Sequence, residues 1–521
     1  MPFLKKISPR RSQVRKNISA ERFSQITRLL DTDSLISILL WCLFVVLCVP
    51  ILTFEHIRPI SYLNLILTTV IVVLICLAVA FYIHHYQKKI IKNHARALAL
   101  VGLFILLLAA TKLGALLPIK HTFWATGSAV TAAIILTIAY NQRFAIGMIT
   151  FYCLLGCFAT GEFEKYQLTD INLFLTMFAG AITCCFSLRE IRTRMKLLEV
   201  SALAAVVVFI TAGSLACLDF LAQKLSLGEV FKNAGLHAGI TLFVGMFIEF
   251  LLPLIEKVFH IATSMTLLDY SDANQSLLKK LAMEAPGTFS HSLLIGSIAE
   301  AAAEAISRNG LLCRVGAYYH DIGKINKASY FIENEIGSAS RHKELSPTMS
   351  QLIIVGHVKD GIEMAKEYSL PNVLRQFIET HHGTTLIEHF YNEAKKLKTK
   401  NSKGKTIDKP SESEFRYPGP KPRTKEAAIV MLADTIEGAV RSLPEVTPTK
   451  VEAVVHTMAM RRLQDGQFDE CDLSLRELSQ IETSISKTLA AHYHGRIAYP
   501  KAPDVPEDAQ LQAEQSKQKS N

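Results

Sequence analysis

The sequence predicts an all-α protein in two parts: an N-terminal polytopic membrane domain with about eight helical spans, then a helical cytoplasmic domain. Three observations predict this class. Half of the residues are hydrophobic but only 8% are aromatic, so the apolar content is mainly aliphatic. Long runs of Leu, Ile, Val, Ala and Phe with few charges extend to about residue 257. Beyond this point the composition is that of a globular protein, and apolar residues recur with the helical period rather than alternating as in strands.

Eight apolar segments approach the roughly 20 residues that a transmembrane helix needs. In order they are Leu35–Phe54, Tyr62–Ile83, Ala97–Leu117, Phe123–Tyr140, Phe144–Thr160, Ile171–Phe186, Val200–Ala222 and Ala234–Ile255. The fifth and sixth segments are short and can tilt little. The third contains a cation, Lys112, whose ammonium group we expect to extend to the nearby membrane surface.

Basic residues predict the orientation, because Lys and Arg near span ends favour the cytoplasm. The N-terminal segment and the connections after the second, fourth and sixth spans lie on one side if eight spans are present. They contain Lys5, Lys6, Arg10, Arg11, Arg15, Lys16, Lys88, Lys89, Lys92, Arg96, Arg143, Arg189, Arg192, Arg194 and Lys196. We therefore expect residues 1–34 to form a basic cytoplasmic N-terminus, residues 35–257 to form the membrane domain, and both termini to be cytoplasmic.

The net charge of +10 is interpreted in the same way. Basic residues beside an anionic leaflet contribute about 1 kcal/mol each to membrane attraction. No basic run is interleaved with aromatic residues in the manner of a stacking platform for nucleic acid. The expected partner is therefore the lipid bilayer, and no nucleic acid polymer is expected. The ten cysteines show neither the spacing of a zinc site nor that of a disulfide framework.

The second domain is expected over residues 258–499 and is a succession of amphipathic helices. The patterns cover Ser276–Glu284, Ser290–Ser307, Leu311–His320, Ser346–Tyr368, Pro371–His382, Thr385–Lys396, Lys425–Arg441, Pro448–Gln464 and Leu475–Ala491. A stretch rich in Lys, Ser, Pro and Gly over residues 399–423 predicts a loop that interrupts the domain. The polar tail over residues 500–521 is predicted to be disordered.

Seven side chains that can bind a metal lie in or at the ends of these apolar helical patterns. They are His291, His320, Asp321, His357, His381, His382 and Asp434. An unpaired imidazole or carboxylate is expensive to bury, so one common partner is expected for all of them. Imidazole and carboxylate without thiolate suit divalent iron, manganese or zinc. Seven ligands exceed one tetrahedral site, which predicts two metal ions with one carboxylate bridging them.

The ordered set H…HD…H…HH…D resembles that of the HD-domain phosphohydrolases. Longer stretches are similar to the bacterial seven-transmembrane HD proteins, over nearly everything after about Leu251: EAPGTFSHSLLIGSIAEAAAEAI, RVGAYYHDIGK, FIETHHGT and DGQFDECDLSLRELSQI are examples. The resemblance implies an HD domain, a location in the bacterial cytoplasmic (inner) membrane, and hydrolysis of cyclic di-AMP to pApA. It also implies that the two divalent metal ions are iron or manganese.

The same resemblance implies how the ligands are divided. One metal would be held by His291, His320, Asp321 and Asp434, and the other by His357, His381 and His382, with Asp321 bridging the two. Asp321 and Lys324 are the expected catalytic residues. Lys324 lies one turn beyond the HD pair, where its ammonium group could meet the phosphate or stabilise developing charge. Weaker candidates for substrate contact are Lys359, His342 and Arg441.

The sequence departs from the family in two places. Ser290 stands where many relatives carry a second histidine, although the ligand His291 is kept. Only about seven residues, Glu55–Ser61, join the first two spans, which leaves no room there for the large extracellular domain of many members.

Two alternative functions remain open. The first is an HD hydrolase of another nucleotide, such as cyclic di-GMP, a linear oligonucleotide or a guanosine alarmone. Cyclic di-GMP enzymes with a related site typically carry Gly-Tyr-Pro soon after the paired histidines, and HHGTTLIEHFY lacks this signature. The second is a membrane receptor that binds a cyclic dinucleotide without turnover. A homo-oligomer also remains open.

Overall fold

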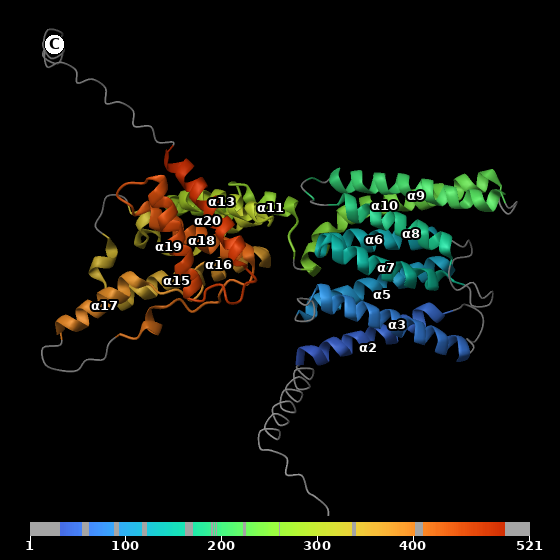
Figure 1. Cartoon of the computed structure of the whole chain (residues 1–521), viewed down its shortest axis with the longest axis horizontal. Helices are drawn as coiled ribbons and strands as arrows, with labels where there is room; N and C mark the ends of the chain where they lie inside the picture. Colours follow the sequence, from blue (N-terminus) through green and yellow to red (C-terminus); the bar gives the residue numbers. More distant parts are fainter. Residues whose placement is uncertain are drawn as a thin grey trace, which may run out of the picture. The chain divides into compact units, whose positions relative to one another are not determined.

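The described elements of the chain are helices, which confirms the all-α class. The computed structural model describes residues 32–54, 62–87, 93–116, 122–161, 170–188, 191, 193, 195–221, 226–259, 261–335, 340–401 and 410–494. Within these ranges there is no strand, only an isolated bridge between Leu386 and Arg416. The chain divides into two compact units between Thr266 and Leu267 (Figure 1).

Several predicted features lie outside the described residues. They are residues 1–31 of the basic N-terminus, the connection Glu55–Ser61, the tail 500–521, and Lys88, Lys89, Lys92, Arg189, Arg192 and Arg194 of the basic connections.

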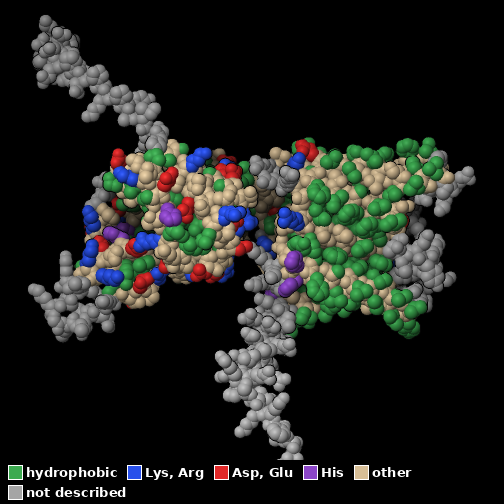
Figure 2. Space-filling model, viewed as in Figure 1, with side chains coloured by type: hydrophobic (Ala, Val, Ile, Leu, Met, Phe, Trp, Pro, Cys, Tyr) green, Lys and Arg blue, Asp and Glu red, His purple; other side chains and the backbone are tan. Residues whose placement is uncertain are grey.

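The first unit is a bundle of long apolar helices that run side by side (Figure 1). Its helices are α2 (Thr32–Thr53), α3 (Tyr62–Tyr86), α5 (His94–Leu116), α6 (Phe123–Ala139), α7 (Gln142–Thr160), α8 (Ile171–Ser187), α9 (Met195–Leu221) and α10 (Leu227–Phe259). Helix α6 is buried over most of its length because α5, α7, α8 and α10 all pack against it. Large apolar side chains such as Leu39, Phe81 and Phe250 instead cover the outside of the bundle (Figure 2). An apolar surface of this extent indicates contact with lipid, so the chain is a multi-pass membrane protein.

The predicted count of about eight spans is not confirmed. Six of the described helices are long and apolar enough to cross a membrane: α2, α3, α5, α7, α9 and α10. Helices α6 and α8 have 17 residues each. At a rise of about 1.5 Å per residue they extend roughly 26 Å, less than the roughly 30 Å of a hydrocarbon core. The fifth predicted segment belongs to the longer helix α7, whereas the fourth, which corresponds to α6, is one of the short ones.

Lys112 of α5 binds to the end of a neighbouring helix. Its side chain is only 6% exposed, and its Nζ donates a hydrogen bond to the carbonyl oxygen of Leu52 at 3.1 Å. Leu52 lies in the last turn of α2, where carbonyl groups lack partners within their own helix and carry partial negative charge. The ammonium group therefore binds at the end of a neighbouring helix, and its extension to the membrane surface stays a prediction.

The second unit is built around one buried helix. Its elements are α11 (Ser264–Ser271, across the division), α12 (Ser276–Glu284), α13 (Pro286–Ala305), α14 (Gly310–Tyr319), η2 (Ile322–Tyr330), η3 (Ile332–Asn334), η4 (Arg341–Glu344), α15 (Pro347–Glu367), α16 (Asn372–Thr380), α17 (Glu388–Asn401), η5 (Glu412–Phe415), α18 (Lys425–Arg441), α19 (Pro448–Gln464) and α20 (Leu475–His494). The residues Ala427 to Ala433 of α18 are all buried, since α13, α14, α16, α19 and α20 pack around it. The next residue is Asp434, so this core fixes one of the predicted ligands.

The helical pattern predicted α12, α18 and α19 with the observed bounds, and most other helices within a few residues. The 3-10 helices η2 to η5 and the short α11 were not predicted, because segments of this length show no clear period. The predicted loop over residues 399–423 is described in part. Helix α17 continues to Asn401, and residues 402–409 are not described. The description resumes at residue 410, and Phe415 is buried, with 1% of its surface exposed.

Candidate metal centre

Five structural elements bring the predicted ligands together. His291 lies in α13, His357 in α15 and Asp434 in α18, while His320 and Asp321 follow α14, and His381 and His382 follow α16. Two groups have ligand atoms that all lie within 4.8 Å of one another. The first contains His291, His320 and Asp321, and the second contains Asp321, His357, His381 and His382. Asp434 is next to the first group: its Oδ1 lies 3.1 Å from His291 Nε2 and 3.8 Å from His320 Nε2.

Glycine allows the close approach that joins these elements. A Cβ atom on Gly323, in the HDIG motif, would overlap the carbonyl oxygen of His357 and the backbone nitrogen of Gly361. The first turn of η2 therefore lies directly against α15, which places Asp321 beside His357. After the paired histidines, Gly383 has φ of +52°, a conformation that side chains rarely adopt and that ends the helical segment.

Asp321 lies between the two groups, and each of its carboxylate oxygens faces one of them. Oδ2 is 3.2 Å from His320 Nε2 and 3.9 Å from His291 Nε2. Oδ1 is 3.4 Å from His357 Nε2 and 3.5 Å from His381 Nε2. This is the arrangement expected of a carboxylate that bridges two cations.

Three of the histidines are oriented by their own helices. The Nδ1–H group of His320 donates to the carbonyl of Ala317 at 2.6 Å, that of His357 to Ile354 at 2.5 Å, and that of His381 to Ile378 at 2.9 Å. A neutral ring that donates from Nδ1 has a free lone pair on Nε2, which is the form that binds a metal. All three Nε2 atoms point to the centre of the cluster.

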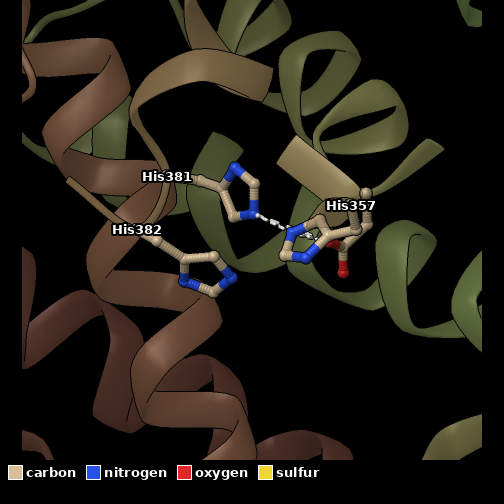
Figure 3. A group of neighbouring side chains, drawn as sticks. His357, His381 and His382 are labelled. Atoms are coloured by element: carbon tan, nitrogen blue, oxygen red, sulfur yellow. Dashed lines mark hydrogen bonds and ion pairs between the residues drawn. The ribbon is translucent and has the colours of Figure 1, made fainter. Parts of the chain in front are cut away.

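The lone pairs that face the centre need a positive partner. His357 Nε2 lies 3.1 Å from His381 Nε2 (Figure 3), and because both rings already donate from Nδ1, two lone pairs meet there. Asp321 Oδ1 is buried without a hydrogen-bond partner among the described residues. Buried polar atoms are rarely left in this state. The donor set, nitrogen and oxygen without sulfur, fits divalent cations in both groups.

The pKa shifts agree with a site prepared for cations. Burial is the main cause that lowers the pKa of His357 to about 3 and that of His382 well below its usual value. Both rings are therefore neutral at pH 7, as ligands must be. Burial also disfavours the charged form of His320, but the neighbouring Asp321 carboxylate outweighs it and raises the pKa of His320 to about 10. Without a cation, His320 thus holds a proton that a metal would displace.

Sequence reasoning missed the carboxylate behind His291. Glu437 is 2% exposed, and its Oε2 lies 2.9 Å from His291 Nδ1. It lies three residues after Asp434, one turn along α18, so both carboxylates face the same ring from one helix. This spacing was the available signal, but an acidic residue near the end of an amphipathic helix is usually a surface group.

Lys324 is bound by two carboxylates. Its Nζ lies 2.7 Å from Asp321 Oδ2 and 2.7 Å from Glu333 Oε1, and it also lies over the ring of Phe331 at 5.0 Å. The charge of Lys324 is thus directed at the bridging carboxylate. Glu333, which holds the ammonium group from the other side, was not predicted.

The weaker candidates for substrate contact lie farther from the ligands. His342 donates from Nε2 to the carbonyl of Tyr330, and Arg441 lies 3.8 Å from Glu437. The side chain of Lys359 is exposed on α15. Among the described contacts, none of these three touches one of the seven ligands. Tyr417, which was not predicted, stacks on His382 with ring centroids 4.2 Å apart.

Comparison with known proteins identifies both units. The family described as "7TM receptor with intracellular HD hydrolase" matches residues 62–263, a range that begins at α3, and the family described as "HD domain" matches residues 288–439. Two relatives are named cyclic-di-AMP phosphodiesterase PgpH. That of Bacillus subtilis is 38% identical over 380 residues, and that of Listeria monocytogenes is 34% identical over 377 residues.

Each of these alignments covers 71% of this chain and 50% of the relative, so the chain spans about half the length of the curated relatives it matches. Two crystal structures of the L. monocytogenes PgpH HD domain are also similar. One is 42% identical with a TM-score of 0.39, and the other, in complex with cyclic-di-AMP, is 41% identical with a TM-score of 0.40. They match 42% and 43% of this chain and 100% of their own chains. Residues 62–263 thus match the membrane region, and residues 288–439 the HD domain, of seven-transmembrane proteins with an intracellular HD hydrolase domain.

Proposed function

We propose that this protein is a membrane-anchored, metal-dependent phosphodiesterase that hydrolyses cyclic di-AMP to pApA. The observation that carries the proposal is the position of Asp321, whose two oxygens face two separate groups of histidines. The substrate follows from the relatives, which are named cyclic-di-AMP phosphodiesterases.

The seven predicted ligands would hold two divalent cations. His291, His320, Asp321 and Asp434 would bind the first, and His357, His381 and His382 the second, with Asp321 shared. Two such cations supply Lewis-acid charge for a phosphodiester and lower the pKa of water. We propose iron or manganese, the metals that the resemblance to the HD-domain phosphohydrolases implies, and a donor set of imidazole and carboxylate without thiolate suits both.

The chain's own residues have three tasks in this proposal. The histidines with Nδ1 bonded to their own helices keep their Nε2 atoms oriented without rearrangement. Lys324 places a positive charge 2.7 Å from Asp321, where it offsets the negative charge that accumulates at a phosphate. Helix α18, whose residues Ala427 to Ala433 are all buried, fixes the position of Asp434 in the first group.

The proposed setting is the cytoplasmic (inner) membrane of a bacterium, with both termini in the cytoplasm. Residues 1–34 would form a basic N-terminal segment, residues 35–257 the membrane domain and residues 258–499 the HD domain. The substrate is a cyclic dinucleotide, and a homo-oligomer is compatible with this arrangement.

The test uses the full chain purified in detergent and loaded with Mn²⁺ or Fe²⁺. Cyclic di-AMP, cyclic di-GMP, linear pApA and a guanosine alarmone are supplied separately, and products are separated by chromatography. We expect pApA from cyclic di-AMP and loss of this product in Asp321→Ala. Faster turnover of another nucleotide would replace the proposed substrate. Tight binding of cyclic di-AMP without product in either metal would indicate a receptor instead.

A further inference from the structure

One guanidinium group beside the ligand cluster has no anionic partner. Arg462 in α19 directs Nε and Nη2 at the hydroxyl of Thr435, at 3.3 and 3.1 Å. Thr435 follows the ligand Asp434 in α18, so Arg462 lies on the α19 side of the metal centre. Among the described residues, no carboxylate oxygen lies within 4.0 Å of this guanidinium.

Neighbouring arginines are paired, which makes the state of Arg462 unusual. The adjacent Arg461 forms an ion pair with Glu388 on the surface, and Arg416 is 2.9 Å from Asp465. Arg462 instead donates two hydrogen bonds, from Nε and Nη2, to one neutral hydroxyl. Its Nη1 amino group has no partner among the described residues. A buried charge is expensive unless an opposite charge accompanies it.

Two neighbouring groups of the metal centre interact with the charge of Arg462. Burial lowers the pKa of the guanidinium, and the strongest opposing influence is the Asp434 carboxylate, which is too far for an ion pair. The charge of Arg462 also acts on the buried hydroxyl of Tyr417, whose ring stacks on His382. Arg462 thus interacts through its charge with Asp434 of the first group and with Tyr417, the residue that stacks on His382 of the second.

We propose that Arg462, oriented by Thr435, forms an anion-binding subsite next to the two metal positions and takes a phosphate oxygen of the substrate. A guanidinium is a planar fork that can bind two phosphate oxygens, and a partly buried one binds them with little competition from water. The inference rests on the proposed metal positions but does not depend on which base the nucleotide carries.

The test measures binding of inorganic phosphate to the Mn²⁺-loaded full chain in detergent by calorimetry, with metal content determined in parallel. We expect Arg462→Gln to keep the metal and to weaken phosphate binding by about 10- to 100-fold, the effect of one charged hydrogen-bonding group. Arg462→Lys should be intermediate because it keeps the charge but loses the fork. The matched control Arg461→Gln should change phosphate binding by less than about twofold.

Two results would overturn the subsite. The first is an Arg462→Gln protein that binds phosphate as the original chain does. The second is loss of metal in both Arg462→Gln and Arg462→Lys, which would make Arg462 a support for Asp434 rather than a binding group. If phosphate binding depends on Arg462 while cyclic di-AMP yields no product, the subsite stands and the proposed function fails.

Discussion

Replacement of Glu437 tests whether the carboxylate behind a ligand determines metal affinity. Glu437 Oε2 lies 2.9 Å from His291 Nδ1, and its side chain is 3% exposed. A buried carboxylate in this position keeps the proton on Nδ1 and the lone pair on Nε2, and it makes the ring more basic. Glu437→Gln keeps the shape and an acceptor oxygen but removes the charge, whereas Glu437→Leu removes both.

The expected magnitude follows from the effect of such partners in other metal sites. Loss of a group that orients a ligand typically weakens metal binding about 10- to 100-fold, or roughly 1.4 to 2.7 kcal/mol. We expect Glu437→Gln near the lower value and Glu437→Leu near the upper one. The nearby Arg441 lies 3.8 Å from Glu437 and is 43% exposed, so Arg441→Gln should have an effect below about threefold.

The assay is competition with a chelator of known affinity, followed by metal analysis of the purified full chain. Because the two groups share only Asp321, one of two bound ions should be weakened in the Glu437 variants, and the second should be retained. A metal affinity of Glu437→Leu within twofold of that of the original chain would refute the reasoning, because it would show that Glu437 does not orient His291. Equal loss of both ions would also contradict it.

Three further outcomes are expected. Gly323→Ala in η2 should destabilise the second unit by at least about 2 kcal/mol in denaturant unfolding, because the new Cβ overlaps the His357 carbonyl. The control Gly356→Ala, in α15 next to His357, meets nothing within 4 Å and should be nearly neutral. Metal affinity should rise about tenfold per pH unit between pH 6 and 8. The pKa of His320 is raised to about 10 without a cation, so metal binding must displace one proton, and this becomes easier as the pH rises. A metal affinity that does not change with pH would contradict this. Chelation of tightly bound metal should lower the melting temperature by about 10 °C, and the melting temperature of Asp321→Ala should not respond to the chelator.

The sequence was sufficient to predict which ionisable side chains lie close together, because their positions are anomalous there. An ionisable side chain within an apolar helical pattern, such as His357 or Asp434, has no explanation in packing alone. Local signals also sufficed for the long helices. The contacts that support the ligands could not be predicted in this way, because Glu333 and Glu437 occupy positions where an acidic residue is ordinary and only the folded chain brings them to Lys324 and His291.

Lys112 and Arg462 show the same limit for basic residues. From the sequence alone each resembles a cation whose long side chain reaches water. In the structure Lys112 instead binds the Leu52 carbonyl at the end of α2, and Arg462 lies beside Asp434 with a hydroxyl as its partner. Whether a basic side chain binds inside the fold or reaches water depends on which helix packs beside it. The local sequence does not contain that information.

The two groups of ligands are attached to different parts of the fold, and this explains the importance of the HDIG turn. His291 and Asp434 belong to the packed pair α13 and α18, whereas His357 and His381 belong to α15 and the end of α16. Each imidazole is fixed to its own support, so no side chain except Asp321 can adjust the distance between the groups. That distance is therefore set by the packing of these elements on one another: the backbone contact of η2 with α15 at Gly323, and the contacts of α16 with α14 and α18. A substitution that separates η2 from α15 should therefore impair both metal positions, although all seven ligand residues are still present.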